Sequence, residues 1–204
     1  PETPVERGKV LSAEDLDRLG GFSRYLDVDG DGVPYRTLPG TPHDKAGYFT
    51  RGTGHDEHAR YSEKAEDWIA NMDRLSRKFE SIRGAMPPPE VRFEPGAHVG
   101  VVCCGTSRYA MEEASDQLRE EQGLETSWLR LKAYPFTDSL DEFIKAHDRV
   151  YVIDQNRDAQ LLALMKLDLD PKMLLKLRSV RYYGGLPLYA RTVSDDIAGQ
   201  EGLK

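Results

Sequence analysis

The apolar positions of this chain follow two different periods, and the change between them divides it into parts. Between residues 62 and 84 apolar side chains recur at three- and four-residue spacing, which predicts a long amphipathic helix capped by Ser62 and ended near Gly84. The stripe consists of Trp68, Ile69, Met72, Leu75, Phe79 and Ile82. Residues 87–89 are all proline and mark a stiff linker, so residues 62–95 are expected to join two regions.

Beyond the prolines, short apolar runs alternate with stretches of helical period. Strands are predicted at 99–103, 128–131, 150–153 and 180–183, and helices over about 108–121, 139–147 and 158–167. This alternation is typical of an α/β domain with a largely parallel sheet. We therefore predict a three-layer, open α/β domain over residues 96–204.

The region before the helix has little periodic apolar pattern. Residues 1–61 are rich in glycine, and a short helix beginning after Ser12 is the one element they indicate. A long irregular stretch usually wraps another surface or forms a functional loop. We expect residues 1–61 to form an extended arm whose packing partner lies elsewhere.

Charge and composition narrow the function classes. The 204 residues carry 28 basic and 35 acidic side chains, a formal charge of -7, and no segment concentrates the basic residues that nucleic-acid backbones require. No apolar run approaches the roughly 20 residues of a membrane-spanning helix. These patterns favour a cytoplasmic protein with neither nucleic acid nor membrane as a partner. The chain begins at Pro1 without an initiator Met, which indicates a processed or truncated polypeptide.

Two clusters invite a metal or acid–base interpretation. Asp27, Asp29 and Asp31 alternate as in the opening of a calcium loop, but the twelfth position is Leu38 and the eighth is Pro34, so a glycine-rich turn held by aspartate side chains is favoured. Residues 55–58 read His-Asp-Glu-His in a turn context and are expected to support an interface. The remaining histidines, expected to be surface or capping residues, are His43, His98 and His147. No catalytic or metal-ligating residue is assigned.

The two cysteines are adjacent, at Cys103 and Cys104. Neighbours in a strand point to opposite faces, so the usual disulfide geometry is not available to them. A disulfide framework and a cysteine-ligated metal cluster are both excluded on this count.

Polar residues follow two of the predicted strands. Gly105, Thr106 and Ser107 come after the first strand and open a helix, which suits either an anion at the helix N-terminus or a plain turn with Ser107 as N-cap. After the third strand, polar side chains include Gln155, Asn156 and Gln160. Ligands of open α/β sheets collect at the carboxyl ends of the strands, so these six residues form the predicted pocket rim.

Several phrases, taken in order, resemble the C-terminal part of the α subunit of the 2-oxoacid:ferredoxin oxidoreductases, most closely the 2-oxoglutarate type. They lie at residues 9–16 (KVLSAEDL), 25–40 (YLDVDGDGVPYRTLPG), 48–57 (YFTRGTGHDE), 71–75 (NMDRL), 78–79 (KF), 129–131 (LRL), 135–136 (PF), 151–160 (YVIDQNRDAQ), 178–180 (RSV) and 185–188 (GLPL).

The resemblance implies a complex that decarboxylates a 2-oxoacid on thiamine diphosphate with Mg²⁺, passes electrons through iron–sulfur clusters to ferredoxin, and makes acyl-CoA. Residues 96–204 would then resemble the C-terminal domain of transketolase, and residues 1–61 the end of the preceding pyrimidine-binding domain. The partners implied are the rest of the α subunit, the β subunit and ferredoxin.

The family's Tyr-Pro-Ile-Thr-Pro stretch and cluster cysteines are not in this sequence, so we expect the chain alone to be inactive. Its share would be subunit assembly and part of a CoA-facing surface at Gly105, Thr106, Ser107, Gln155, Asn156 and Gln160. Two other interpretations stay open, a purely structural interaction domain and an independent anion- or nucleotide-binding α/β module.

Overall fold

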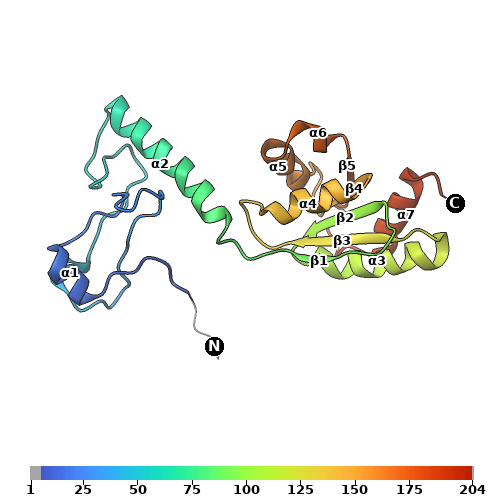
Figure 1. The fold of residues 1–204 in the computed structure, drawn as a ribbon, viewed down its shortest axis with the longest axis horizontal. Helices are drawn as coiled ribbons and strands as arrows, with labels where there is room; N and C mark the ends of the chain where they lie inside the picture. Colours follow the sequence, from blue (N-terminus) through green and yellow to red (C-terminus); the bar gives the residue numbers. More distant parts are fainter. Residues whose placement is uncertain (1–5, 204) are drawn as a thin grey trace. The chain divides into compact units, whose positions relative to one another are not determined.

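The chain folds as two compact units, Pro1–Ile82 and Arg83–Lys204. The computed structural model describes residues 6–203, so the first five residues of the predicted arm and the last residue of the predicted α/β domain lie outside the described residues. The division falls at the end of the long helix, which therefore groups with the arm. Figure 1 gives the element labels used below.

The described arm, residues 6–61, is mostly irregular. It contains α1 (Ala13–Leu19) and a 3-10 turn, η1 (Asp44–Ala46), together with isolated bridges between Val10 and Arg36 and between His55 and Tyr61. Ser12 caps α1 in a capping box with Asp15, as its sequence predicts. The irregular character expected of this region is present, but these residues form a compact unit with the long helix that follows them.

Helix α2 (Ala65–Arg83) begins later than its sequence suggests, so the prediction that Ser62 is its N-cap is wrong. The Ser62 backbone N–H donates to the Gly54 carbonyl at 3.1 Å, next to the His55–Tyr61 bridge. This bond holds Ser62 in the arm. Its hydroxyl accepts from the Lys64 N–H at 3.2 Å and donates to the Asp67 carboxylate, so the first helical turn forms after it.

The face of α2 that meets the arm is polar. Arg74 is the buried residue of the helix, at 8% exposure, whereas Trp68, Ile69 and Met72 are 57%, 56% and 38% exposed. An amphipathic helix ordinarily buries its apolar stripe. In α2 the polar residue Arg74 is buried instead, and the apolar residues Trp68, Ile69 and Met72 are exposed.

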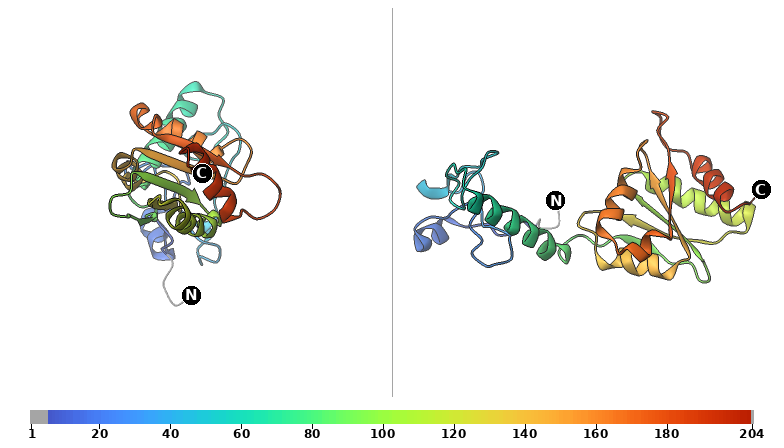
Figure 2. Two further views of the ribbon diagram at one scale, coloured as in Figure 1. Left: turned by 90° about the vertical axis from the view of Figure 1, so that its right-hand side faces the viewer. Right: turned by 90° about the horizontal axis from the view of Figure 1, so that it is seen from above.

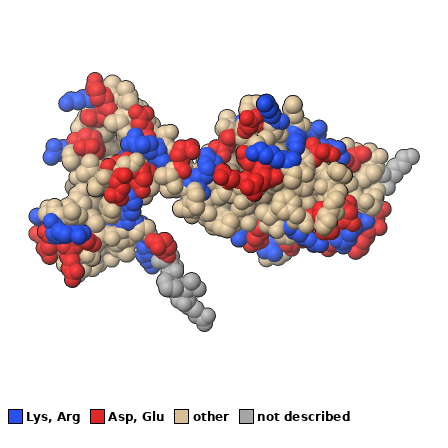
Figure 3. Space-filling view, viewed as in Figure 1, with Lys and Arg blue, Asp and Glu red and all other residues tan. Residues whose placement is uncertain are grey.

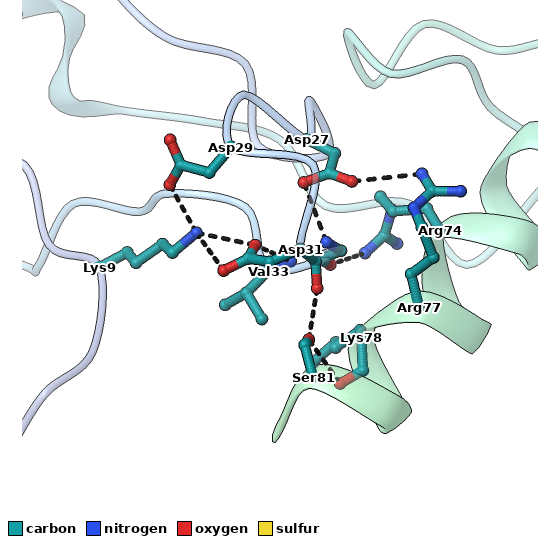
Figure 4. A network of polar contacts seen from close by, with 10 residues as sticks. Lys9, Asp27, Asp29, Asp31, Val33, Arg74, Arg77, Lys78 and Ser81 are labelled. Carbon is teal, nitrogen blue, oxygen red and sulfur yellow. Dashed lines mark hydrogen bonds and ion pairs between the residues drawn. The ribbon is translucent and has the colours of Figure 1, made fainter. Parts of the chain in front are cut away.

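Hydrogen bonds and ion pairs hold the 27–33 turn between the start of the arm and α2 (Figure 4). Lys9 Nζ lies 2.6 Å from Asp29 and 2.7 Å from Asp31. Asp27 accepts from the Gly32 N–H at 3.0 Å and pairs with Arg77 at 3.2 Å. The aspartates are therefore engaged with cations and backbone donors, which confirms the predicted glycine-rich turn.

The second unit is built on a five-stranded sheet in the order β1-β3-β2-β4-β5. Strand β1 pairs antiparallel with β3, and all the other pairs are parallel. The strands are β1 (Glu90–Arg92), β2 (Val99–Cys104), β3 (Thr126–Leu131), β4 (Arg149–Asp154) and β5 (Leu177–Arg181). The helices are α3 (Ser107–Gln122), α4 (Asp138–Ala146), α5 (Gln160–Asp168), α6 (Pro171–Leu174) and α7 (Ala190–Gln200).

Helices cover both faces of this sheet (Figures 1 and 2). Along β2, Val102 joins the core under α4 and α5, whereas Val101 and Cys103 join the core under α3 and α7. Alternate side chains of one buried strand thus feed two apolar layers. The predicted three-layer, largely parallel α/β fold is confirmed.

Three elements of this unit are absent from the sequence prediction, β1, α6 and α7. Strand β1 is three residues long and has no buried residue, so it leaves no apolar signature. Helix α7 does carry one, since Ala190, Val193 and Ile197 are buried at helical spacing. Strand β5 begins at Leu177 rather than 180, because Leu177 pairs with Val150 and is buried.

His147 is the C-cap residue of α4, as the capping alternative predicted, and it is buried rather than on the surface. Its ring is 2% exposed, donates to the Phe143 carbonyl at 2.6 Å, and stacks on Phe93. Burial lowers the pKa of His147 below its ordinary value. His98 is exposed, and His43 caps η1 by accepting from the Lys45 N–H, as expected.

Charged side chains of both signs are interspersed on the face seen in Figure 3. Among residues 6–203, no helix combines the length and apolar character needed to cross a membrane.

Candidate functional site: a pocket where the strand connections diverge

The strand order creates a crevice between the ends of β2 and β4. The chain leaves β2 through α3 to reach β3, and it leaves β4 through α5 to reach β5 on the opposite side. Ligands of open α/β sheets bind outside the carboxyl ends of strands at such a divergence. The loops after β2, β4 and β5 are therefore the segments placed to form a site.

After β2 the chain turns at Gly105, whose φ of +61° is in the left-handed region that favours glycine. Thr106 is the N-cap residue of α3 but makes no side-chain capping bond, and Ser107 is the first helical residue, 6% exposed. The prediction of Ser107 as N-cap is thus wrong. The first turn of α3 holds no acidic residue, so nothing there offsets the positive end of its dipole.

After β4 the chain is shaped by two side chains that bind backbone N–H groups. The buried Asp154 carboxylate accepts from Leu161 at 2.8 Å and Leu162 at 3.2 Å. Asn156 accepts from the N–H groups of Asp158 and Gln160, both at 3.1 Å. These bonds fix the backbone of the loop and the first turn of α5. The Asn156 side-chain oxygen is therefore used within the loop.

The loop after β5 completes the pocket. The Tyr182 N–H donates to the Asp154 carbonyl at 3.0 Å, and the Gln155 side chain donates to the Leu186 carbonyl at 3.5 Å. These two contacts join the loops that follow β4 and β5. The result is a cavity of about 780 Å³, here called the rim pocket. It is lined by Thr106, Tyr109, Ala110, Gln155, Tyr182, Tyr183, Gly185, Leu186, Pro187 and Leu188.

Two of the six rim residues named from the sequence, Thr106 and Gln155, line this pocket. Gly105, Ser107, Asn156 and Gln160 flank it in the chain without lining it. Sequence reasoning missed the tyrosines and the 185–188 segment. The signal for them was available, because a Tyr-Tyr pair followed by Gly-Gly-Leu-Pro is typical of an exposed loop rather than of a strand end.

The rim pocket is lined by aromatic, apolar and uncharged polar residues. Tyrosine rings provide flat apolar surface with a polar end, and the start of α3 favours negative charge. Together they suit a ligand with a planar or apolar body and an anionic group near Thr106.

The neighbouring thiols are poorly suited to nucleophilic chemistry. Burial raises the pKa of Cys103 to about 12. Burial, with a smaller contribution from the Asp154 carboxylate, also raises the pKa of Cys104. A raised pKa leaves less of the reactive thiolate. Among residues 6–203, no group of three or more His, Cys, Asp or Glu side chains is placed to hold a metal ion.

The 55–58 turn of the first unit forms a structural network. His55 is buried, stacks on Tyr25 with ring centroids 4.0 Å apart, and contacts the Asn71 amide at 3.1 Å. Asp56 accepts from the N–H groups of His58 and Arg60, both at 2.9 Å, which lowers the pKa of Asp56. The expected turn is present.

The architecture belongs to the class of open α/β sheets with a pocket where the strand connections diverge. Among solved structures, the fold is similar to 2-oxoglutarate:ferredoxin oxidoreductase from Magnetococcus marinus, a structure with 2-oxoglutarate, coenzyme A and succinyl-CoA bound. The TM-score is 0.71 at 22% identity, over 90% of this chain and 31% of that one. This chain therefore spans about a third of the length of that protein.

Two other solved structures are less similar to this chain. The alpha chain of a probable 2-oxoacid ferredoxin oxidoreductase from Thermoplasma acidophilum has a TM-score of 0.37 at 19% identity, over 56% of this chain and 97% of that one. A split-gene transketolase has a TM-score of 0.40 at 17% identity, over 64% of this chain and 55% of that one. No protein-family model and no curated protein matches the sequence.

Proposed function

We propose that this chain is the C-terminal part of the α subunit of a 2-oxoacid:ferredoxin oxidoreductase. The observation that carries the proposal is the similarity of fold to the Magnetococcus enzyme over 90% of this chain, which includes the arm as well as the α/β unit. The sequence phrases of both parts resemble the same family. The reaction of the complete enzyme would convert a 2-oxoacid, with 2-oxoglutarate as the first candidate, to acyl-CoA and CO₂ while ferredoxin is reduced.

Within that complex, the rim pocket is proposed to contact coenzyme A. Its tyrosines offer flat surfaces for the adenine ring or the pantetheine arm, and the start of α3 offers backbone N–H groups for a phosphate. Gln155 would hold the two loops together through its bond to Leu186. These residues bind and orient, because the pocket lining contains no carboxylate, imidazole or thiol that could transfer a proton at neutral pH.

The redox and decarboxylation chemistry is proposed to reside in other parts of the complex. Thiamine diphosphate would supply the carbanion-stabilising centre, and iron–sulfur clusters would accept the electrons. An iron–sulfur cluster is ordinarily held by four cysteine thiolates. The sequence contains two cysteines, one of them buried in the core, so its donor set does not fit a cluster.

A purely structural role in assembly is the second candidate, and the exposed stripe of α2 favours it. Trp68 and Ile69 are adjacent on the helix and both more than half exposed. Large exposed apolar patches mark contact surfaces in soluble proteins. On this account the arm and α2 form a docking surface for another part of the complex, and the rim pocket contacts no small molecule.

The test of the family assignment is an activity measurement on the natural protein purified with its associated subunits. A panel of 2-oxoacids would be supplied with CoA and oxidised ferredoxin, and ferredoxin reduction followed spectroscopically. We expect CoA-dependent reduction, fastest with 2-oxoglutarate. If no 2-oxoacid supports CoA-dependent reduction, the assignment is wrong. If another 2-oxoacid is preferred, the family stands and the substrate changes.

A further inference from the structure

The arm contains a second cavity with a different character. It has a volume of about 440 Å³ and brings together residues 22–24, 47–49, 51 and 58–61 of the first unit. Here it is called the arginine pocket. Its charged lining residues are Arg24, Arg51 and Arg60, and its aromatic ones are Phe22, Tyr48, Phe49 and Tyr61. The lining contains one histidine, His58, and no carboxylate.

Of the three arginines of this pocket, Arg60 is attracted by the Asp56 carboxylate. Among residues 6–203, none of the three forms a salt bridge, in a chain whose net charge is -7. Other arginines of the same unit are paired, for example Arg18 with Asp15 at 2.7 Å and Arg77 with Asp27 at 3.2 Å. Arg36 and Arg74 of this unit are likewise without a salt bridge among the described residues, so what distinguishes the pocket is that three guanidinium groups surround one cavity.

Contacts within the loops position two of these groups, Arg51 and Arg24. The Arg51 Nε–H donates to the Ala59 carbonyl at 2.5 Å, which leaves both terminal nitrogens of Arg51 unengaged by that bond. The Arg24 guanidinium lies 5.8 Å from the centroid of the Tyr48 ring. Ala59, which also lines the cavity, is buried and has a φ of +62°, an unfavourable conformation for alanine.

The aromatic part of the pocket is exposed to solvent. Phe49 is 77% exposed, Tyr61 58% and Tyr48 42%, and the Phe22 and Tyr48 rings meet edge to face with centroids 5.6 Å apart. Tyr61 donates its hydroxyl to Glu63, outside the lining. His58 contacts the Ser23 hydroxyl at 2.8 Å and lies 3.4 Å from Glu57. The pocket thus offers flat apolar surface beside concentrated positive charge.

We propose that the arginine pocket binds a phosphorylated small molecule with a planar ring, and that a nucleoside diphosphate is the class that fits. A carboxylate ligand carries one negative charge and would balance one guanidinium. A diphosphate carries nearly three negative charges, which match three arginines. Guanidinium groups bind phosphate oxygens through paired N–H donors. The exposed rings offer a stacking surface for a base. The volume lies within the roughly 300–1,000 Å³ usual for small-molecule sites.

This site is distinct from the rim pocket. It lies in the first unit, shares no residue with the rim pocket, and is independent of the proposed enzyme function. Failure of the CoA proposal would leave it unaffected.

The test is calorimetric titration of ADP, pyrophosphate and adenosine into the full chain at low ionic strength. We expect saturable binding of ADP that the arginine variants weaken, weaker binding of pyrophosphate and the weakest binding of adenosine. Arg24→Gln and Arg60→Gln should each weaken ADP and pyrophosphate about tenfold. Phe49→Ala should weaken ADP and leave pyrophosphate unchanged, because only the base uses the ring. Arg18→Gln, an exposed arginine of the same unit outside this lining, is the matched control and should change neither.

Circular dichroism spectra and melting curves would confirm that each variant keeps the native fold. The absence of saturable binding of both ADP and pyrophosphate at millimolar concentration would overturn the proposal. So would binding that both arginine variants leave unchanged, because the nucleotide would then lie elsewhere on the chain. Equal losses in Arg24→Gln, Arg60→Gln and Arg18→Gln would also contradict it, since they would indicate non-specific charge attraction.

Discussion

Gly32 lies directly against the backbone of Lys78 on helix α2. A Cβ atom placed on Gly32 would come within 2.3 Å of the Lys78 nitrogen and 2.6 Å of the Arg74 carbonyl oxygen. The Arg74 side chain donates to the Gly32 carbonyl at 3.1 Å. The turn therefore contacts the helix both through this side chain and by direct approach of the two backbones. This close approach lets the polar face of α2 hold an arm that has few buried apolar residues.

Gly32→Ala should therefore detach the 27–33 turn from α2. Gly30 has a similar φ, +77° against +78°, but nothing lies within 4 Å of its Cβ position, which makes Gly30→Ala the matched control. The control should cost about 1–2 kcal/mol from backbone conformation alone, and Gly32→Ala should cost more. The measurement is limited proteolysis of residues 6–61. Equal protection of the two variants would contradict the account.

The pairing of Glu201 with Arg149 and Tyr151 predicts a pH-dependent contribution to stability. The two Arg149–Glu201 bonds measure 2.6 and 2.7 Å, and the Tyr151 hydroxyl donates at 2.5 Å. Burial raises the pKa of Glu201, but these hydrogen bonds outweigh it and hold the pKa below its ordinary 4.5. Glu201→Gln should lower the free energy of unfolding by about 1–3 kcal/mol near pH 7.

Because the folded-state pKa of Glu201 is depressed, this stabilisation is present above pH 4.5 and is lost as the pH falls through the lower folded value. Urea unfolding of the native chain and of Glu201→Gln should therefore converge at acidic pH. Glu125→Gln, at an exposed position, is the control. A difference between native chain and Glu201→Gln that stays constant down to pH 3 would refute the explanation.

Protonation of His147 should destabilise the folded chain at a higher pH than protonation of Glu201 does. Burial lowers its pKa below 6.5, so between the folded value and 6.5 the unfolded chain binds a proton that the folded chain does not. The free energy of unfolding should decrease as the pH falls below 6.5, by at most about 1.4 kcal/mol per pH unit. Lys176 and His98 also lower this pKa, whereas Asp148 and the bond to Phe143 raise it.

His147→Gln should flatten this slope, whereas His98→Gln, at a 78% exposed side chain, should preserve it. The measurement is urea unfolding at several pH values between 5 and 7.5. Identical slopes in the native chain and His147→Gln would show that another group is responsible.

The exposed apolar residues of α2 can be substituted to test assembly without disturbing the fold of the chain. Trp68→Gln and Ile69→Gln should change the melting behaviour of the isolated chain little, about 0.5 kcal/mol or less, since both side chains are solvent-exposed. In the natural complex the double variant should release other subunits on size-exclusion chromatography. Full retention of all subunits would argue against the assembly role of α2.

The α/β unit was largely predictable because buried strands and amphipathic helices leave different periods in the sequence. Val99 through Cys103 are buried as a continuous run, and this run predicted β2 within one residue. The position of α7 was recoverable from Ala190, Val193 and Ile197. Strand β1 was not, because a short edge strand buries nothing.

The candidate site was harder to predict, because loops carry no period. Thr106 and Gln155 could be placed from the rule about strand ends, but Tyr182 and Tyr183 were assigned to a strand that in fact ends at Arg181. The sequence also could not predict that α2 turns its polar face, rather than its apolar stripe, toward the arm. Periodicity indicates which residues share a face, and whether that face is buried depends on the contacts that Arg74 and Gly32 make in three dimensions.

Calorimetric titration of coenzyme A into the chain tests most directly whether the rim pocket binds coenzyme A. The native sequence would be compared with a Gln155→Ala, Tyr183→Ala double variant, which alters the rim pocket lining. Gln160→Ala, at an exposed position next to the pocket but outside its lining, is the control. We predict saturable binding that the double variant weakens at least about tenfold and the control preserves. No saturable binding by the native chain, or equal binding by the double variant, would contradict the assignment of the rim pocket to coenzyme A.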